Sequence, residues 1–584
     1  MCGIVGYTGR RAAAPVLLEL LKKLEYRGYD SAGISVMGKG GIQTYKRAGK
    51  VEGISSARTL GGNTGIGHTR WATHGAPSDI NAHPHVYGKC AIVHNGIIEN
   101  SRVLMEAIGA EEKFLSETDS EVIAHLIDDG YQGDLLRAVR EAVVKLKGAY
   151  AIAVLHEDEP ERIVCARNGS PLIVAMREGE NLVASDLSAV SAAGTQAYLL
   201  QDGEFAVLDR EGVSFYDSEL RPVEKMPMEF DIGNDAADKK GYRHFMKKEM
   251  DEIPSVLSQT ILKSANDSAF KQFCRVLCQT EYIHIVACGT AYHSGLCAKY
   301  AIESLCRIPV EVKIASEYRY CNPIIPPKTL VIAVSQSGET ADTLAAARLA
   351  KERGAYLAAI TNVPYSSITR LADCVLYTSA GAEIAVAATK SFNAQLAMLY
   401  SVALLKKGET ENFSRLASLA EETLRRAEEV RGWTPYFLGA KSVYFIGRGV
   451  DYCAALEGSL KLKEISYLPS EGYPAGELKH GTLALVDTDT PVVAILTQRE
   501  LAEKTMNAVH ETRCRGARVF LITSIEEAAK STEATASVLI PKCREIFSPI
   551  LSVIPLQALA YYTSIARGND PDKPRNLAKS VTVE

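Results

Sequence analysis

Short apolar runs of strand length alternate with polar turns up to about residue 228. These runs lie at 4–7, 32–36, 90–94 and 149–154, and they end in turns that contain glycine or aspartate. Amphipathic helices are predicted near 12–25 and 119–129, because apolar residues there recur at helical spacing. Strands and helices in separate groups are typical of layered α+β packing, so we predict one layered domain over residues 1–228.

The pattern changes after residue 281, where near-continuous apolar runs alternate with helix-length segments. The runs are 282–287, 330–334 and 356–361. Strands of this kind are buried on both faces, which predicts a parallel sheet covered by helices. The pattern then repeats, because 285–292 resembles 445–452 and 330–334 resembles 491–495. We therefore predict two copies of one doubly wound α/β domain.

The rest of the chain divides around these two copies. A polar, glycine-containing linker is predicted over 229–250, with a helix from about 247 to 262. The α/β copies occupy 251–428 and 429–575. Residues 576–584 form a C-terminal tail, which by its composition alone is expected to be disordered.

Composition limits the function without naming it. The chain has 584 residues, 47% hydrophobic and 23% charged, which is usual for a soluble globular protein. The net charge of −5 gives no electrostatic reason to expect binding to nucleic acid or to an anionic membrane. There is no run of about 18 apolar residues and no signal-peptide pattern, so no transmembrane helix or export is expected. Thirteen scattered cysteines indicate reduced thiols in a cytoplasm, and no cluster predicts a metal site.

Cys2 is the first candidate for chemistry. Removal of Met1, which is easy before a small residue, would leave Cys2 with both a thiol and a free α-amine. The amine has a pKa near ~8, so it can act as a base beside the sulfur. The dipeptide alone is equally consistent with an ordinary cysteine near a frayed end.

Four polar segments interrupt the apolar pattern of the first domain, as loops at functional sites do. They are residues 24–33, 67–75 with 81–85, 94–100 and 116–121. Each has a simple structural explanation when taken alone. Asn95-Gly96 can form a hairpin turn, residues 116–119 can cap a helix, and Arg70 can form a surface salt bridge.

Together with Cys2, these segments resemble the glutaminase domain of the N-terminal-nucleophile amidotransferases, in the same order along the chain. The resemblance implies a four-layer αββα fold and attack by Cys2 on the side-chain amide of glutamine. It assigns the oxyanion donors to the Asn95 side chain and the Gly96 N–H. It places six residues around the glutamine: Arg70 at the carboxylate, Asp119 at the ammonium group, Trp71 as a gate for ammonia, and Thr73, His74 and His83 as further contacts. The last two histidines have a simpler explanation as structural residues.

Residues 335–340 of the first α/β copy combine a strand end, a hydroxyl-rich turn with glycine and a helix N-terminus. Backbone N–H groups and the helix dipole at such a turn favour an anion, at the sheet edge where ligands bind. Ser335, Ser337 and Thr340 would add hydroxyl donors to a phosphate. A helix capped by its own hydroxyl side chain is the alternative. The second copy has no such residues at 496–499, so one phosphate site is predicted per chain.

The second copy supplies charge instead. Glu457, Lys461 and Glu464 lie at i, i+4 and i+7 of a helix predicted near 453–467, and therefore on one face. A solvated stripe of salt bridges is the simpler explanation for this spacing. The polar segment 471–481 that follows is too loop-like to belong to a core.

The two copies resemble sugar isomerase (SIS) domains. The three domains in this order resemble the isomerising glutamine–fructose-6-phosphate aminotransferases over essentially the full length. The motifs that carry this resemblance are residues 2–6, the Arg70-Trp71 loop, 335–340, 461–464, 476–481 and 576–584. It implies conversion of glutamine and fructose 6-phosphate to glutamate and glucosamine 6-phosphate, the first step of hexosamine synthesis, with ammonia channelled from Cys2 to the isomerase site. No metal or organic cofactor is expected.

The resemblance also implies roles at the sugar. Glu464 would move a proton between C1 and C2, and Lys579 would lie at the sugar carbonyl under the closed tail. His480 would assist ring opening from the neighbouring subunit, which implies a homodimer. Lys461 would neutralise developing charge. The residues implied at the sugar phosphate are Thr290, Ser335, Gln336, Ser337, Thr340 and Lys461.

Two departures and two alternatives remain. Ala291 and Ala388 stand where the family usually has serine, both near the expected sugar phosphate. Phosphoribosyl-pyrophosphate amidotransferase and asparagine synthetase share the Cys2 domain, but the sequence has neither a phosphoribosyl-binding motif nor an ATP-pyrophosphatase glycine loop. A sugar-phosphate-sensing regulator is the alternative from another class, because SIS domains also serve as binding modules.

Overall fold

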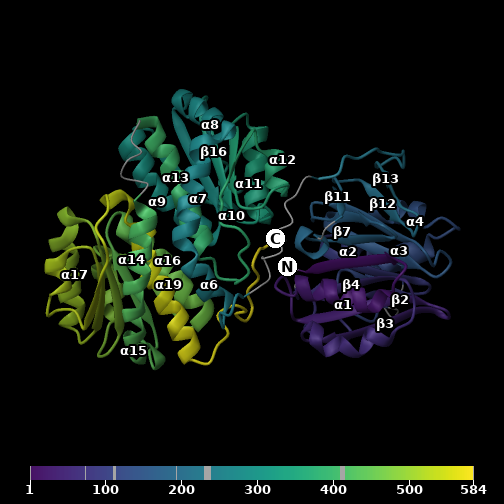
Figure 1. The fold of residues 1–584 in the computed structure, drawn as a ribbon, viewed down its shortest axis with the longest axis horizontal. Helices are drawn as coiled ribbons and strands as arrows, with labels where there is room; N and C mark the ends of the chain where they lie inside the picture. The colour runs from purple at the N-terminus through teal and green to yellow at the C-terminus, as the bar shows by residue number, and fades with distance from the viewer. Residues whose placement is uncertain are drawn as a thin grey trace. The chain divides into compact units, whose positions relative to one another are not determined.

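The computed structural model describes residues 2–72, 74–109, 114–191, 194–228, 239–407 and 415–582. The chain forms two compact units, Met1–Ala237 with Ser580–Glu584, and Asp238–Lys579 (Figure 1). Each unit has its own sheets and its own apolar cores.

The first unit contains two antiparallel sheets. The seven-stranded sheet has the order β11-β9-β10-β1-β4-β2-β3, and the six-stranded sheet has the order β13-β12-β8-β7-β6-β5. The strands are β1 Gly3–Gly9, β2 Ser31–Gly38, β3 Gly41–Ala48, β4 Thr64–Arg70, β5 His85–Tyr87, β6 Cys90–Ile98, β7 Gly148–His156, β8 Ile163–Asn168, β9 Ile173–Arg177, β10 Glu180–Ala184, β11 Gln196–Leu199, β12 Phe205–Leu208 and β13 Val213–Tyr216. The helices are α1 Ala13–Leu24, the 3₁₀ helix η1 Val51–Thr59, α2 Ser101–Ile108, α3 Glu121–Asp129, α4 Leu135–Val143 and α5 Leu187–Val190.

Three apolar cores separate four layers in this unit. Successive residues of β1 face opposite ways, so Val5 joins the core that includes Leu17 of α1, whereas Ile4 joins the core between the two sheets. A third core lies between the second sheet and helices α3 and α4, with Ile92 and Val139 among its members. The predicted αββα arrangement is therefore confirmed.

The second unit contains two parallel five-stranded sheets with the same topology. Their orders are β15-β14-β16-β17-β18 and β20-β19-β21-β22-β23. The strands are β14 Tyr282–Ala287, β15 Val310–Ile314, β16 Thr329–Ser335, β17 Tyr356–Thr361, β18 Cys374–Tyr377, β19 Val443–Gly447, β20 Ser470–Pro474, β21 Pro491–Leu496, β22 Arg518–Thr523 and β23 Ala536–Leu539. The predicted duplication of a doubly wound domain is confirmed.

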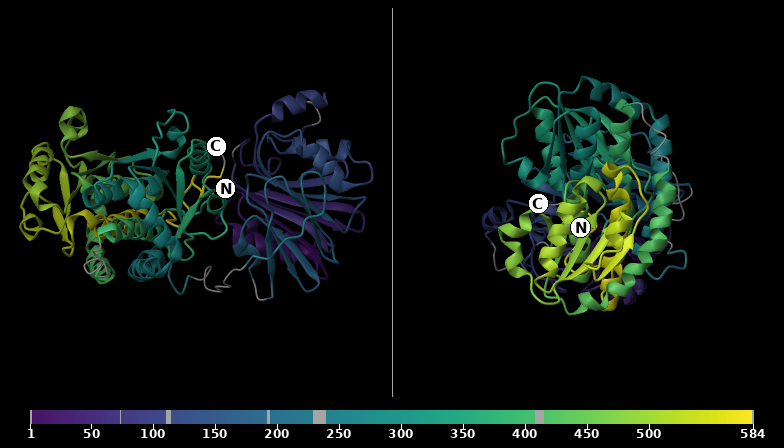
Figure 2. Two further views of the ribbon diagram at one scale, coloured as in Figure 1. Left: turned by 90° about the horizontal axis from the view of Figure 1, so that it is seen from above. Right: turned by 90° about the vertical axis from the view of Figure 1, so that its left-hand side faces the viewer.

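Helices cover both sheets of this unit (Figure 2). The α-helices are α6 Phe245–Asp251, α7 Ile253–Asn266, α8 Ser268–Gln279, α9 Gly289–Cys306, α10 Ala315–Tyr318, α11 Ala341–Glu352, α12 Ser367–Leu371, α13 Lys390–Lys407, α14 Leu416–Ala427, α15 Pro435–Leu438, α16 Val450–Ser466, α17 Ala502–Arg513, α18 Glu526–Ala529 and α19 Pro549–Ala566. The 3₁₀ helices are η3 Glu428–Trp433, η4 Glu477–His480, η5 Thr482–Leu485, η6 Arg499–Leu501 and η7 Glu545–Phe547. One continuous core joins the two copies, with Phe392 of α13 and Leu556 of α19 among its members.

Helix α19 is the one candidate for a membrane span that the described residues contain. The segment Glu545–Ala566 is long and apolar enough by composition, but 89% of its most apolar window is buried inside the protein. It packs closely against α16 in the shared core. Its hydrophobicity is therefore explained by its place in the core.

The segment around residue 250 differs from the predicted continuous helix. Helices α6 and α7 are separated at Glu252, and Pro254 lies in the first turn of α7. Proline lacks an N–H donor and is tolerated in a first turn but not inside a helix, which explains the break. Of the predicted linker 229–250, residues 229–238 lie outside the described residues, and its last residues belong to α6.

Candidate active site

Cys2 lies directly before β1 and beside the end of β4. The pairing of Gly3 with Thr69 brings Cys2 next to Trp71, whose N–H donates a hydrogen bond to Sγ at 3.2 Å. A Cβ on Gly3 would lie 2.7 Å from Thr69 Oγ1, so the close approach of these strands requires glycine. Burial raises the pKa of the Cys2 thiol, while the Trp71 N–H and the charge of Arg70 lower it.

Asn95 and Gly96 reach Cys2 from the other sheet. They lie inside β6, so the hairpin-turn explanation is wrong. The Asn95 side-chain amide donates a hydrogen bond to the Cys2 carbonyl oxygen at 3.1 Å. Gly96 has φ +141°, and a Cβ there would lie 1.9 Å from the Ala149 carbonyl oxygen, so no other residue fits. The predicted nucleophile and the predicted oxyanion donors are thus brought together from two different sheets.

Arg70 and Asp119 are buried charged side chains beside this group. Only 3% of Arg70 and 6% of Asp119 is exposed. In the part of the chain that the structure describes, Arg70 pairs with no carboxylate; it donates to the carbonyl oxygens of His74, Gly75 (2.9 Å) and Ala76. Asp119 accepts a hydrogen bond from the Ile98 N–H at 2.7 Å. The surface salt bridge is therefore wrong for Arg70, and its charge is available to a ligand.

The remaining predicted glutamine contacts have different surroundings. The Trp71 ring is half-buried and packs edge-on against Tyr29, with centroids 5.6 Å apart. The His74 side chain is exposed, and its carbonyl oxygen accepts from Arg70. His83 is buried and stacks on His68, with centroids 4.2 Å apart. Thr73 lies outside the described residues.

The segment preceding α3 is a loop rather than a cap. The N-cap of α3 is Ser120, and its side chain makes no capping hydrogen bond. Ser120 instead contacts His94 Nδ1, with Oγ 2.8 Å away. The predicted capping role of 116–119 is therefore wrong, and this segment holds Asp119 against β6.

Residues 335–340 form a turn at the carboxyl end of β16. Ser335 Oγ and Thr340 Oγ1 lie 3.0 Å apart, and the Gly338 N–H donates to Ser335 Oγ at 3.1 Å. Gly338 has φ +65°, and a Cβ there would lie 2.1 Å from Ser366 Oγ. Thr340 is the N-cap of α11 but makes no side-chain capping bond. The self-capped helix is therefore wrong, and the first N–H groups of α11 remain available to an anion.

The equivalent turn of the second copy is closed by its own chain. The Asp451 carboxyl group accepts hydrogen bonds from the Thr497 N–H at 2.8 Å, from Thr497 Oγ1 at 2.5 Å and from Gln498 Nε2 at 3.2 Å. Asp451 is 2% exposed. Internal bonds therefore occupy the donors that would face a ligand in this copy.

The three charged residues that sequence placed on one face of α16 point inward. The side chains of Glu457 and Lys461 are completely buried, and 21% of the Glu464 side chain is exposed. Lys461 Nζ lies 2.6 Å from Glu464 and donates to Thr290 Oγ1 of the first copy at 2.9 Å. Thr290 in turn donates to Glu457 at 3.1 Å. The solvated stripe is therefore wrong, and the cluster joins the two copies.

Burial and mutual charge set the protonation of this cluster. Burial raises the pKa of Glu464 above its ordinary value, against the lowering effect of Lys461. Burial lowers the pKa of Lys461, but Glu464 and Glu457 outweigh it and raise that pKa. A carboxyl group whose pKa is raised holds a proton more readily, which suits it to proton transfer.

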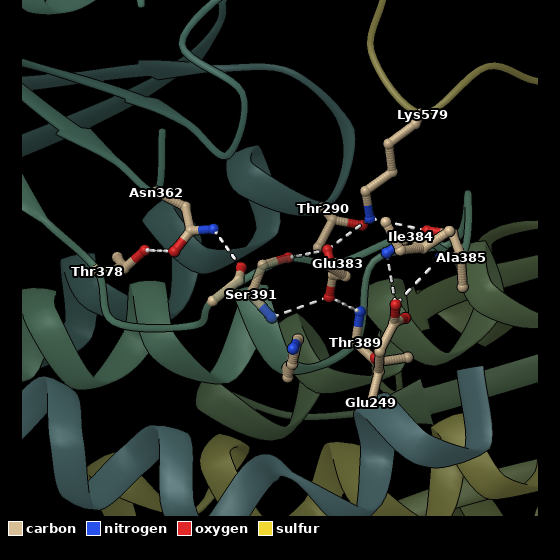
Figure 3. Close-up of polar contacts among 12 residues, drawn as sticks. Glu249, Thr290, Asn362, Thr378, Glu383, Ile384, Ala385, Thr389, Ser391 and Lys579 are labelled. Atoms are coloured by element: carbon tan, nitrogen blue, oxygen red, sulfur yellow. Dashed lines mark hydrogen bonds and ion pairs between the residues drawn. The ribbon is translucent and has the colours of Figure 1, made fainter. Parts of the chain in front are cut away.

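Lys579 reaches from the C-terminal segment to a buried carboxylate (Figure 3). Its ammonium group lies 2.5 Å from Glu383 and 2.8 Å from the Ala385 carbonyl oxygen. Glu383 also accepts from the Thr389 and Ser391 N–H groups, at 2.9 and 3.0 Å. Burial raises the pKa of Glu383, but Lys579 and these donors lower it to about 2.

Glu249 of α6 holds the same loop from the other side. It accepts hydrogen bonds from the N–H groups of Ile384 and Ala385, at 2.5 and 3.1 Å. Burial and the charge of Glu383 raise the pKa of Glu249 to about 8. Sequence reasoning missed Glu249 and Glu383, since no local motif connects residues that lie more than a hundred positions apart.

His480 is separate from these contacts. It ends the 3₁₀ helix η4, and its side chain is exposed.

Ala291 lies in the first turn of α9, next to Thr290, and Ala388 lies next to Thr389 in the loop that Glu383 holds. Among the described residues, no group of three or more histidine, cysteine, aspartate or glutamate side chains is arranged to hold a metal ion.

Two family models match parts of the chain. Residues 68–192 match the glutamine amidotransferase domain, and residues 277–405 and 436–567 each match the SIS domain. The chain is 48% identical over 611 aligned residues to glutamine–fructose-6-phosphate aminotransferase (isomerizing) of Clostridium tetani, covering 100% of both chains. The chain belongs to this aminotransferase family. Aminotransferases of the same name from Aquifex aeolicus and Thermus thermophilus are 46% and 45% identical, again over 100% of both chains.

Solved structures resemble the second unit of this aminotransferase family member. The C-terminal domain of glucosamine-fructose-6-phosphate aminotransferase from Francisella tularensis is 39% identical, with a TM-score of 0.55, covering 58% of this chain and 100% of that one. A glucosamine-6-phosphate deaminase from Thermotoga maritima is 27% identical, with a TM-score of 0.50 over the same shares. The duplicated SIS arrangement is thus shared with phosphosugar enzymes.

Proposed function

We propose that this protein converts glutamine and fructose 6-phosphate to glutamate and glucosamine 6-phosphate, the reaction in the name of its full-length relatives. The observation that carries the proposal is that one chain contains two built sites. One is a cysteine beside a buried arginine that pairs with no carboxylate among the described residues, and the other is a hydroxyl-rich turn beside a buried acid–base cluster. Neither phosphoribosyl transfer nor adenylation accounts for the second site.

In the glutamine half, Cys2 is the nucleophile once Met1 is removed. The Asn95 amide and the Gly96 N–H stabilise the oxyanion that forms when Sγ attacks the side-chain carbonyl carbon. Arg70 binds the glutamine carboxylate, for which a buried planar fork is suited, and Asp119 binds the ammonium group. Trp71, Thr73, His74 and His83 complete the surroundings of the substrate, and Trp71 gates the release of ammonia.

In the sugar half, the turn at the end of β16 binds the phosphate. The residues that we place at the phosphate are Thr290, Ser335, Gln336, Ser337 and Thr340, together with the uncapped first turn of α11. Glu464 transfers the proton between C1 and C2, and Lys461 neutralises the charge that develops on oxygen. Lys579 lies at the sugar carbonyl, and the tail that carries it excludes water.

The proposed organisation follows the domains predicted from sequence. Residues 1–228 hydrolyse glutamine, 251–428 and 429–575 form the isomerase, and 576–584 close the sugar site. Ammonia passes from Cys2 to the sugar without release. We further propose a cytoplasmic homodimer in which His480, exposed on its own protomer, completes the sugar site of the partner by assisting ring opening.

Product analysis tests this function. Purified protein is incubated with glutamine and fructose 6-phosphate, and glutamate and hexosamine 6-phosphate are quantified together. Equal amounts of both, abolished by Cys2→Ala but not by Cys278→Ala at an exposed control cysteine, support the proposal. Glutamate without amino sugar contradicts the proposed acceptor. Neither product, from protein whose N-terminus is Cys2 by mass spectrometry, favours a sugar-phosphate-binding regulator instead.

A further inference from the structure

The orientation of the Asn95 side chain follows from its two neighbours. Its amide nitrogen lies 3.1 Å from the Cys2 carbonyl oxygen, which can only accept a hydrogen bond. Its amide oxygen therefore points the other way, where it lies 3.0 Å from Nε2 of His68. The amide nitrogen has a second hydrogen, for which the described residues show no acceptor.

The same contacts determine the tautomer of His68. Nε2 lies 3.0 Å from the Asn95 amide oxygen and 3.0 Å from the His94 carbonyl oxygen. Both neighbours are acceptors, so Nε2 carries the hydrogen and Nδ1 does not. Burial lowers the pKa of His68 to about 3, so the ring stays neutral. The single N–H of this neutral ring is shared between the Asn95 amide oxygen and the His94 carbonyl oxygen, and it can only donate.

Packing holds the His68 ring in this position. His68 is completely buried in β4, and His83 stacks on it with centroids 4.2 Å apart. His85 packs edge-on against His83 with centroids 4.4 Å apart, and its Nε2 lies 3.1 Å from Thr118 Oγ1. The row of rings therefore runs from the loop before α3 to the side chain that orients Asn95.

We propose that His68 is a positioning residue for the glutamine reaction, which keeps the amide nitrogen of Asn95, rather than its oxygen, directed at the oxyanion. The inference rests on the proposed glutamine hydrolysis at Cys2. Rotation of the Asn95 amide by a half-turn would place its oxygen against the Cys2 carbonyl oxygen and later against the oxyanion. The His68 N–H opposes that rotation because it bonds well only to the oxygen end. His83 acts behind it as a support for the ring.

Two substitutions of similar size distinguish the effect of the His68 hydrogen bond from the effect of its packing. His68→Gln keeps an N–H donor close to the position of Nε2, whereas His68→Met fills the space without a donor. Loss of one oxyanion donor costs about 10²- to 10³-fold in kcat, and a misdirected amide loses part of this. We expect His68→Met to lower kcat for glutamate release about 10- to 100-fold with KM for glutamine little changed. We expect kcat of His68→Gln to be about tenfold higher than kcat of His68→Met.

Alkylation of Cys2 by iodoacetamide provides the structural control. This reaction forms no oxyanion, so its rate, followed by mass spectrometry of the N-terminal peptide, should be the same in both variants and in the parent. An equal fall in alkylation and kcat would mean that His68→Met simply damages the site, and would overturn the inference. Equal kcat in the methionine and glutamine variants would overturn it as well.

A double-substitution test asks whether His68 acts through Asn95. In an Asn95→Ala background, His68→Met should lower kcat no further, because the side chain that it orients is gone. A further tenfold loss would contradict the inference. Should the methionine variant be insoluble, His68→Asn replaces it, because its shorter amide does not reach Asn95. Absence of glutamine hydrolysis in the parent protein would contradict the proposed function instead, so the two failures are distinguishable.

Discussion

The ammonium group of Lys579 lies 2.5 Å from the carboxylate of Glu383, and 6% and 0% of these two side chains is exposed. Removing one partner of a buried pair leaves an uncompensated charge, at a cost of about 3–5 kcal/mol. Glu383 is itself fixed by three donors from the segment 389–391. A side chain that is distant in sequence thus positions the lysine that we place at the sugar carbonyl.

Replacement of Glu383 should therefore uncouple the two halves of the reaction. Glu383→Gln keeps the shape of the side chain but removes the charge that holds Lys579. We expect formation of amino sugar to fall about 10- to 100-fold, whereas glutamate release persists. Glu281→Gln, which removes an exposed partner of Lys328, is the control and should change neither product. Unchanged amino-sugar formation in Glu383→Gln would show that the pair is not needed.

Glu249 should make stability depend on pH. Its ordinary pKa of 4.5 is raised to about 8 in the folded protein by burial and by Glu383, against the lowering effect of Lys579. Between these values the unfolded chain has released the proton and the folded chain has kept it, so stability falls as pH rises from about 4.5 to 8. Glu383, whose pKa is lowered to about 2, loses its stabilising effect only as pH falls below about 4.5.

Glu249→Gln should remove that dependence. The amide oxygen can still accept from the Ile384 and Ala385 N–H groups, but the group no longer titrates. We expect the difference in Tm between the variant and the parent to grow in favour of the variant from pH 5 to pH 8. Thermal unfolding at four pH values measures it, with Glu500→Gln as an exposed control. A constant difference across this range would count against the raised pKa.

The two alanines beside the proposed phosphate site offer a gain of function. Ala291 follows Thr290 in α9, and Ala388 precedes Thr389 in the loop that Glu383 holds. A hydroxyl that bonds to a charged phosphate contributes about 1.5–3 kcal/mol, reduced by any water that it displaces. We expect Ala291→Ser and Ala388→Ser each to lower KM for fructose 6-phosphate about 3- to 10-fold. KM for glutamine serves as the internal control, and a rise in KM for the sugar would contradict the placement.

Arg70 should determine binding of glutamine rather than the chemical step. Arg70→Lys keeps the charge but loses the planar fork that holds the 74–76 backbone and suits a carboxylate. We expect KM for glutamine to rise about 10- to 100-fold, with a smaller change in kcat. Arg11→Lys, at a side chain that is 55% exposed, is the matched control. Loss of kcat at unchanged KM would assign Arg70 a different role.

Local patterns predicted most of the architecture and the residues at its turns. Strand periodicity located β14, β16 and β17, and the repeated segments revealed the duplicated sheet. The turn after β16 was recognisable because glycine and hydroxyl residues at a strand end have a direct physical meaning. The fixed break between α6 and α7 was missed, although Pro254 carried the signal for it.

The unpredicted residues share one property, which is that tertiary packing alone brings them to the site. Glu249 lies on a helix that was assigned to a linker, and Glu383 lies in an irregular loop. His68 lies within a motif that sequence reasoning had found, yet its partner Asn95 belongs to another sheet. Periodicity describes a residue's own element, so it cannot identify a contact between two elements.

Asp451 makes the two copies of the duplicated fold different at equivalent turns. Its carboxyl group accepts the hydrogen bonds of the turn after β21, so these donors of the second copy are occupied by the chain itself. Helix α16 of this copy instead carries acid–base side chains, and Lys461 among them contacts the first copy. In the proposed reaction the first copy binds the phosphate, and the second copy supplies the acid–base side chains. The Asp451 carboxyl group maintains this difference, because it occupies the turn after β21 that corresponds to the proposed phosphate-binding turn after β16.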